Sequence, residues 1–164
     1  MTYRHDLAER SADIHWPDGY DPRDADLFAH NHITIDQPAE AIWQHLIAAG
    51  SWPQWYSNSH DVVVDDASGL LAEGVSCGWS TFGLKITSTV AEFVPEERIG
   101  WYGTGEGLRA YHTWLLLPDD SITYMVMEEV GLGPGAQQLA RTNPGHMHRG
   151  HELWNISLKF LCET

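Results

Sequence analysis

The segment between positions 33 and 56 constrains the fold of this chain most, because it combines a short strand, a helix and an aromatic turn. Asp36 can cap a helix, and Pro38 suits the first helical turn, where no backbone donor is needed. Gly50 stops that helix, and Trp52 to Trp55 fits a second, short helical turn. Four apolar residues fall at helical spacing on one face: Ile42, Trp43, Leu46 and Ile47.

The rest of the chain reads as a run of strands followed by helices. Strands are expected at 29–36, 61–65, 77–82, 84–94, 98–103, 109–117 and 121–130. A helical stretch at 136–142 is stopped by Asn143-Pro144-Gly145, and a helix fits 146–163. One face of this last helix carries Met147, His151, Trp154, Leu158 and Leu161. The pattern predicts an α+β fold with a closing C-terminal helix.

Four short motifs, in this order and spacing, resemble one known superfamily. They are Pro38-Ala39-Glu40-Ala41-Ile42-Trp43, Trp52-Pro53-Gln54-Trp55, Val94-Pro95-Glu96-Glu97-Arg98-Ile99-Gly100-Trp101 and Trp154-Asn155-Ile156-Ser157-Leu158-Lys159. The chain resembles the START-like or SRPBCC superfamily, and within it the polyketide cyclases and dehydrases. The resemblance implies the helix-grip fold, in which a curved antiparallel sheet wraps around a long C-terminal helix and a cavity lies between them. Residues 29–164 would form this domain, and residues 1–28 an acidic N-terminal extension packed on it.

Charge and composition narrow the classes of partner. The 164 residues carry 9 Lys and Arg against 23 Asp and Glu, for a net charge of −14, and no basic stripe is visible. Such a chain repels phosphate backbones and anionic membranes, so neither nucleic acid nor membrane is expected as a partner. Eight Trp suit an apolar core and also an apolar ligand cavity. The expected partner is a hydrophobic or aromatic small molecule, and a homodimer stays open.

The cysteines and the lengths of the apolar runs indicate the cellular compartment. Cys77 and Cys162 lie far apart without CxxC spacing, so both are expected to be reduced thiols. The first residues contain no apolar run typical of a signal peptide, and no stretch approaches the roughly 18 apolar residues of a membrane span. These features predict a cytoplasmic protein.

Three residues are the candidates for catalysis: His112, His151 and Glu128. His112 shares a strand face with Trp114, and His151 shares the apolar helix face with Trp154. Glu128 and Glu129 must point to opposite faces of their strand, and periodicity alone does not choose between them. An inward Glu128 beside His112 is the proton-transfer pair that we expect.

A larger set is expected to contact a ligand, because large rings line apolar cavities and Arg109 could bind a ligand carboxylate. It comprises Trp55, Tyr56, Trp79, Trp101, Arg109, Trp114, Tyr124, Met147 and Trp154. His146, His148 and His151 suggest a metal cluster, but no HExxH or CxxC motif accompanies them. We therefore expect no metal and no cofactor.

The resemblance implies a small-molecule cavity protein that binds an apolar or aromatic ligand. If the protein is an enzyme, the implied chemistry is a cofactor-independent cyclisation or dehydration of the polyketide cyclase type. Two other readings stay open. One is a non-catalytic carrier or sensor of a lipid-like or aromatic molecule. The other is a stress protein or chaperone cofactor that acts through its surface.

Overall fold

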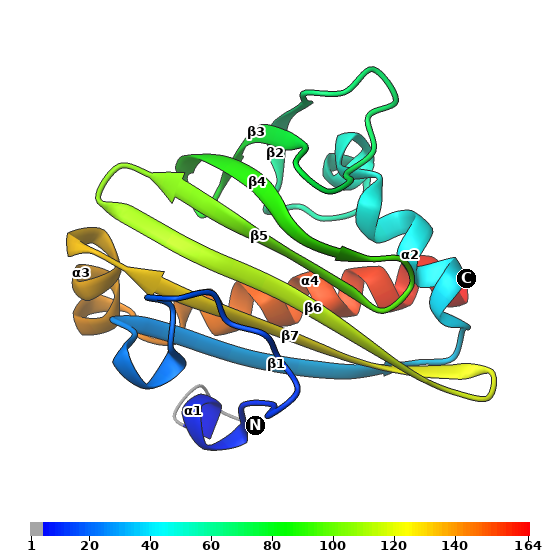
Figure 1. Ribbon diagram of the computed structural model, residues 1–164, viewed down its shortest axis with the longest axis horizontal. Coiled ribbons are helices and arrows are strands. Elements are labelled where there is room, and N and C mark those ends of the chain that lie inside the picture. Colours follow the sequence, from blue (N-terminus) through cyan, green and yellow to red (C-terminus); the bar gives the residue numbers. More distant parts are fainter. Residues whose placement is uncertain (1–4) are drawn as a thin grey trace.

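A single curved sheet of seven antiparallel strands organises the molecule (Figure 1). The computed structural model describes residues 5–164. Along the sheet the order is β1-β7-β6-β5-β4-β3-β2, so β1 and β2 are its edges. The strands are β1 Leu27–Ile35, β2 His60–Val64, β3 Ser76–Thr81, β4 Leu84–Val94, β5 Arg98–Gly105, β6 Leu108–Asp119 and β7 Ile122–Leu132.

Helices cover the concave face of this sheet. Between β1 and β2 lie α2 (Ala39–Ile47) and a short 3-10 helix (Ala49–Gln54). After β7 come α3 (Pro134–Thr142) and α4 (His146–Glu163), and α4 runs across the sheet (Figure 1). The predicted α+β arrangement is confirmed. The expected ends of the strands, of α3 and of α4 differ from the observed ones by at most two residues, whereas the 3-10 helix begins three residues before the turn expected at Trp52.

The spacing of apolar residues explains why α4 grips the sheet. Its inward positions recur at intervals of four, three and four residues, which places them on one helical face. They are Met147, His151, Trp154 and Leu158, all of them buried. Beneath α4, Trp52 packs edge-on against Trp154 and Trp79, with ring centroids 5.1 Å apart in both pairs. The indole nitrogen of Trp52 donates a hydrogen bond of 3.1 Å to the Leu46 carbonyl.

The N-terminal arm, residues 5–26, lies on the convex face of the same sheet. It contains α1 (Asp6–Glu9) and a 3-10 turn (Pro22–Asp24). Ile14 packs with Leu115 of β6 and Val126 of β7. The central strands β6 and β7 are therefore buried on both faces, by helices on one side and by the arm on the other. Residues 1–4 of the expected extension lie outside the described part of the chain.

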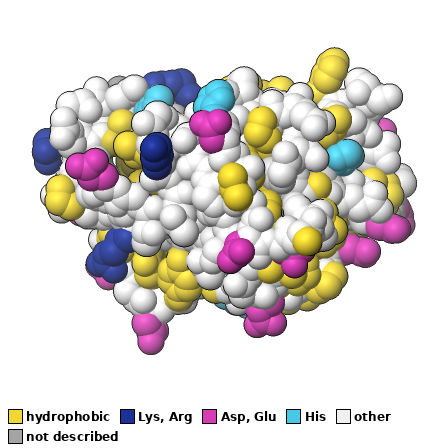
Figure 2. Space-filling model, turned by 90° about the horizontal axis from the view of Figure 1, so that it is seen from above, with side chains coloured by type: hydrophobic (Ala, Val, Ile, Leu, Met, Phe, Trp, Pro, Cys, Tyr) yellow, Lys and Arg dark blue, Asp and Glu magenta, His cyan; other side chains and the backbone are white. Residues whose placement is uncertain are grey.

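Surface and cysteine chemistry complete the description. On the face seen in Figure 2, Asp and Glu side chains are scattered widely, whereas Lys and Arg gather toward one end. Cys77 and Cys162 are free thiols, so the prediction that no disulfide links them is confirmed. Among the described residues, no helix combines the length and the hydropathy needed to cross a membrane.

Candidate functional site

A cavity of about 350 Å³ lies between the concave face of the sheet and helices α3 and α4. Its walls are mostly apolar and aromatic, and its size is within the range of small-molecule sites. The larger apolar side chains of the wall are Trp79, Phe82, Ile86, Trp101, Leu108, Leu139, Met147 and Trp154. Three ionisable side chains of the wall lie close together: His112, Glu129 and His151. A second depression, of about 470 Å³, follows the arm from Arg10 to Arg23. It is an open surface groove that contains neither histidine nor glutamate.

Three elements bring one ionisable side chain each to the same point of the cavity wall. His112 of β6 and Glu129 of β7 are direct cross-strand partners, and His151 projects from the inner face of α4. One carboxylate oxygen, Glu129 Oε1, lies 2.9 Å from His151 Nε2 and 3.4 Å from His112 Nδ1. We call this group of His112, Glu129 and His151 the inner cluster.

Aromatic rings hold the two imidazoles of the inner cluster in place. The His112 ring stacks on Trp101 with centroids 4.7 Å apart and planes 12° apart, and it meets the edge of Trp114 at 5.0 Å. His112 and His151 themselves meet edge to face at 5.1 Å. His112 Nε2 and His151 Nδ1 are buried and have no hydrogen-bond partner among the described residues. When each ring donates its proton to Glu129, the second nitrogen of each ring is an unshared acceptor.

Electrostatics favour an ionised Glu129 beside a neutral His112. Burial alone would raise the pKa of Glu129, but the hydrogen bonds from His112 and His151 outweigh it and lower the pKa to about 2. Burial lowers the pKa of His112, and the nearby Glu129 carboxylate offsets this only in part. At neutral pH His112 is therefore a neutral base held beside a carboxylate.

The cavity brings together about half of the residues expected from sequence. His112 and His151 line it, as do Trp79, Trp101, Met147 and Trp154. Five expected ligand contacts, Trp55, Tyr56, Arg109, Trp114 and Tyr124, are not among the lining residues. Two of these five support the wall from behind.

The supporting residues are Tyr56 and Trp114, both fully buried. The Tyr56 ring stacks on Trp154 at 4.5 Å, and Trp114 meets the edge of Trp154 at 4.6 Å. Arg109 instead lies over the Tyr20 ring on the convex face, and Tyr124 packs beside His32 there. Sequence reasoning missed Phe82, which reaches the cavity from the β3–β4 turn because Gly150 of α4 has no side chain to block its ring.

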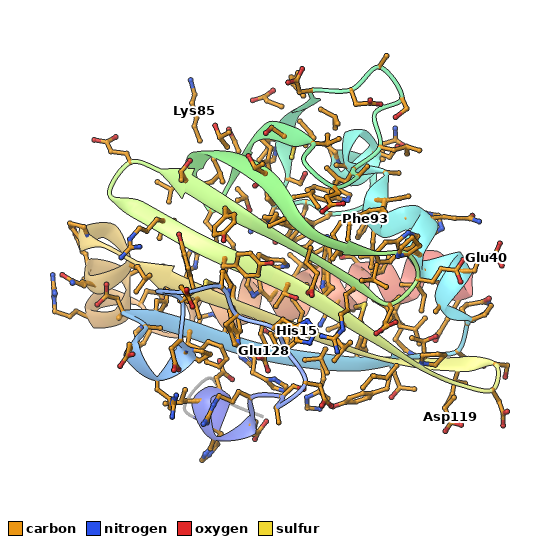
Figure 3. The ribbon with its side chains drawn as sticks, viewed as in Figure 1. His15, Glu40, Lys85, Phe93, Asp119 and Glu128 are labelled. Atoms are coloured by element: carbon orange, nitrogen blue, oxygen red, sulfur yellow. The ribbon has the colours of Figure 1, made fainter. Side chains whose placement is uncertain are left out.

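The expected position of Glu128 is wrong. Its carboxylate lies on the convex face, where Oε2 accepts hydrogen bonds from His30 Nδ1 at 2.6 Å and from the Ser11 backbone N–H at 2.7 Å. Figure 3 shows Glu128 beside the N-terminal arm. The physical reason is register: Asp119 pairs with Ile122 around a two-residue turn, and this places Glu129 opposite His112. The expected strands 109–117 and 121–130 implied a turn at 118–120, whereas the observed turn is at 120–121. A two-residue turn read from the sequence would have predicted that Glu129 pairs with His112.

The three histidines of the possible metal cluster on α4 do not converge. His148 Nδ1 lies 2.9 Å from Asp6 Oδ2 of the arm, His146 packs against Phe82, and His151 belongs to the inner cluster. Two other groups of described residues bring three metal-donor atoms within 4.8 Å of one another. One is the inner cluster, and the other consists of Glu9, His30 and His32 on the convex face.

The fold and cavity define an α+β protein of the helix-grip class, and solved structures agree. A hypothetical protein from Helicobacter pylori has 26% identity and a TM-score of 0.86, over 93% of this chain and 98% of that one. Because 93% of this chain is covered, the matched region includes part of the N-terminal arm. The Zhui aromatase/cyclase from Streptomyces sp. R1128 has 13% identity and a TM-score of 0.67, over 83% and 93%. A START superfamily protein from Mycobacterium smegmatis has 13% identity and a TM-score of 0.63, over 83% of this chain and 97% of that one.

Sequence comparison gives the family. Residues 29–143 match the family described as polyketide cyclase / dehydrase and lipid transport, and the chain belongs to this family. The predicted START-like and polyketide cyclase-like relationship is thereby confirmed. No curated protein matches the chain closely in sequence.

Proposed function

We propose that the cavity binds a small apolar or aromatic molecule that carries a carbonyl group, and that the inner cluster catalyses proton transfer on it. The observation that supports this most is that two imidazoles, from β6 and α4, share one carboxylate oxygen in the wall of a mostly apolar cavity. A cavity that only stored an apolar molecule would have no need for three ionisable groups in its wall, because their burial is costly.

Each member of the inner cluster has a separate role in this proposal. His112, neutral and buried, takes a proton from the carbon next to the carbonyl and leaves an enolate. Glu129 stabilises the imidazolium that forms. The enolate carbon then attacks a second carbonyl of the same ligand, and the His112 imidazolium gives its proton to the resulting alkoxide, which returns His112 to the neutral state. His151 holds Glu129 in place by donating its Nε2–H to the carboxylate. Removal of a second carbon-bound proton and protonation of the leaving hydroxyl would complete a dehydration. Trp101 and Trp154 position the ligand by stacking.

The experiment follows hydrogen–deuterium exchange at the α-carbon of 2-tetralone, a small aromatic ketone, by NMR in D₂O. The wild-type protein should accelerate exchange above the buffer blank. His112→Gln and Glu129→Gln should each lower the enzyme-dependent rate by about 10²-fold or more, as for the loss of a general base. His60→Gln, at an exposed position outside the cavity, is the matched control.

A carrier or sensor is the second candidate, and the largely apolar wall favours it. In that case the NMR signals of the 2-tetralone ring would shift on binding, but its hydrogen–deuterium exchange would not exceed the blank. Native mass spectrometry would detect a co-purified molecule. The same exchange experiment therefore distinguishes catalysis from storage.

A further inference from the structure

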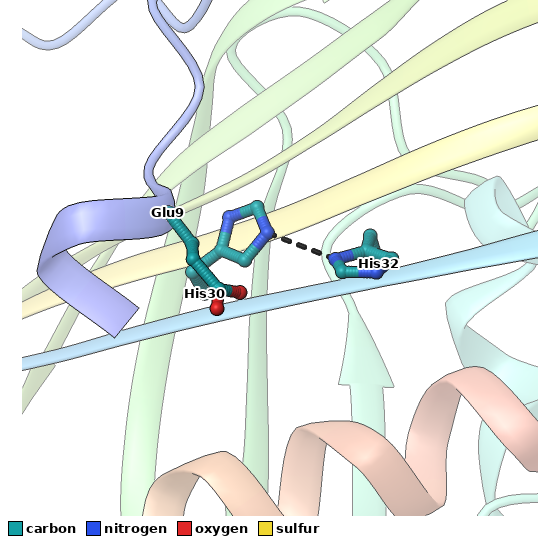
Figure 4. A group of neighbouring side chains, drawn as sticks. All are labelled: Glu9, His30 and His32. Carbon is teal, nitrogen blue, oxygen red and sulfur yellow. Dashed lines mark hydrogen bonds between the residues drawn. The ribbon is translucent and has the colours of Figure 1, made fainter. Parts of the chain in front are cut away.

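A second group of ionisable side chains lies on the convex face, under the N-terminal arm. His30 and His32 are two residues apart on β1, so both side chains point to the same face. His30 Nε2 and His32 Nδ1 lie 3.0 Å apart, and Glu9, the last residue of α1, brings its carboxylate beside them (Figure 4). We call Glu9, His30 and His32 the outer cluster. The proposed proton transfer in the cavity does not use it.

Glu128 determines which nitrogen of His30 faces this cluster. His30 Nδ1 lies 2.6 Å from Glu128 Oε2, and that carboxylate is fully buried. With Nδ1 turned to this carboxylate, Nε2 is the ring nitrogen that faces His32, and it presents a lone pair there when Nδ1 is the donor to Glu128. A buried carboxylate behind a histidine is the arrangement that orients metal-binding imidazoles and raises their basicity.

The donor atoms have the spacing of ligands on one ion. With Zn–N distances of about 2.0–2.1 Å, two nitrogen ligands of one zinc ion lie roughly 3.0–3.4 Å apart. The observed 3.0 Å between His30 and His32 falls within this range. Glu9 Oε2 is buried and has no hydrogen-bond partner among the described residues, so a carboxylate oxygen is left to complete the set. His32 is exposed, which leaves a route for an ion and for water.

Within residues 5–164, the inner cluster lacks a supporting group that would orient its imidazole rings from behind. Its outer ring nitrogens, His112 Nε2 and His151 Nδ1, have no hydrogen-bond partner among the described residues, so no carboxylate or carbonyl orients either ring from behind. Both rings are almost completely buried. The two clusters offer the same donor types, two imidazoles and a carboxylate, but only the outer cluster combines a supporting carboxylate with access from solvent.

We propose that Glu9, His30 and His32 bind a divalent transition-metal ion, with zinc as the expected ion. Two imidazoles and one carboxylate are a zinc donor set, and solvent fills the remaining position. The strongly negative net charge of the chain favours any cation at this surface. Because Glu9 belongs to α1 and the histidines belong to β1, the ion joins the arm to the edge of the sheet.

The test is a titration of the full-length chain, stripped with EDTA and dialysed, with Zn²⁺ by calorimetry and with Co²⁺ by visible absorption. One ion should bind per chain. His32→Ala, which changes an exposed side chain, and Glu9→Gln should each weaken binding by at least about tenfold. His60→Ala, an exposed histidine on the far edge strand, should bind as the wild type does. Circular dichroism of each variant checks that it is folded.

Two results would overturn the proposal. One is a wild-type protein that binds neither Zn²⁺ nor Co²⁺ at concentrations up to about 100 μM, a limit that corresponds to a weak site. The other is binding that survives His32→Ala and Glu9→Gln but disappears in Glu129→Gln, because that pattern would place the ion in the inner cluster. A readout on the arm sharpens the positive case: Zn²⁺ should slow proteolysis within residues 5–26 in the wild type and not in His32→Ala.

Discussion

Glu128 and Glu129 are neighbours on β7, yet they belong to two different sites on opposite faces of one sheet. Glu129 faces the cavity and is shared by two imidazoles, one from β6 and one from α4. Glu128 faces the arm and is shared by one imidazole of β1 and a backbone N–H of residue 11. The residue types are the same, and the elements that cover each face decide what the pair can do.

The covering elements differ in chemistry as well as in position. The inner cluster packs against tryptophan rings, and His112 Nε2 and His151 Nδ1 have no hydrogen-bond partner among the described residues. The outer cluster is covered by a short polar arm, and His32 remains exposed. An enclosed base beside a carboxylate suits proton transfer, whereas an exposed pair of imidazoles with a supporting carboxylate suits ion binding. The following predictions test whether the two faces behave independently.

The largest effect is expected from Trp154→Ala. Trp154 is 2% exposed and contacts Tyr56, Trp79, Trp101 and Trp114, so its loss should reduce the free energy of unfolding by about 3–5 kcal/mol. Urea unfolding measures this, and Phe160→Ala on the exposed face of α4 should change stability by no more than about 0.5 kcal/mol. A loss close to that of the control would mean that the ring lines an open cavity without supporting the core.

A smaller effect is expected from Gly150→Ala, which tests the cavity rim. A methyl group at this helical position would overlap the Phe82 ring, so we expect a loss of about 1–3 kcal/mol. At an open helical position the same change would stabilise by up to about 1 kcal/mol, so even the sign is informative. Adding Phe82→Ala should remove the penalty. Additive losses in this double-mutant cycle would show that the two residues do not meet.

Glu129 should make stability depend on pH in the acid range. Its pKa is lowered from an ordinary 4.5 to about 2, so its stabilising contribution is complete above 4.5 and disappears as pH falls toward 2. The difference in unfolding free energy between wild type and Glu129→Gln should therefore shrink as pH falls below 4.5. Urea unfolding between pH 3 and pH 6 measures it. A difference that stays constant over this range would contradict the ionised carboxylate in the inner cluster.

The smallest effect concerns His112, whose pKa is lowered mainly by burial. Because the unfolded chain takes up this proton first, the contribution of His112 to stability decreases as pH falls through the ordinary value of 6.5. NMR titration of the ring should show protonation at lower pH than in a peptide of residues 109–117. A ring that titrates as it does in the peptide would remove the neutral base from the proposed mechanism.

Much of the fold follows from short patterns in the chain. Alternating residues predicted β4 at its observed bounds, and the intervals of four, three and four in 147–158 predicted the buried face of α4. The break at Asn143-Pro144-Gly145 separates α3 from α4 as expected, because proline cannot continue a helix. The family resemblance then supplied the cavity, and four of the nine expected ligand contacts line it.

The candidate site was less predictable, and Glu128 and Glu129 show why. Alternation establishes that the two side chains point to opposite faces, but it does not say which face is the cavity. Hydrophobicity cannot decide either, because the middle of the convex face of β6 and β7 is buried under the arm, as the concave face is buried under the helices. The position of a two-residue turn decided it, since a shift in strand pairing would place a different residue of β7 opposite His112.

The amino-acid sequence by itself determined the kinds of element, their order and the parity of each side chain, because these depend on residues close together in the chain. Only the tertiary structure decided which histidine meets which carboxylate. His112, Glu129 and His151 come from three elements, and so do Glu9, His30 and Glu128. Such pairs depend on strand register and on what packs over each face, and these are settled by contacts between residues far apart in the sequence.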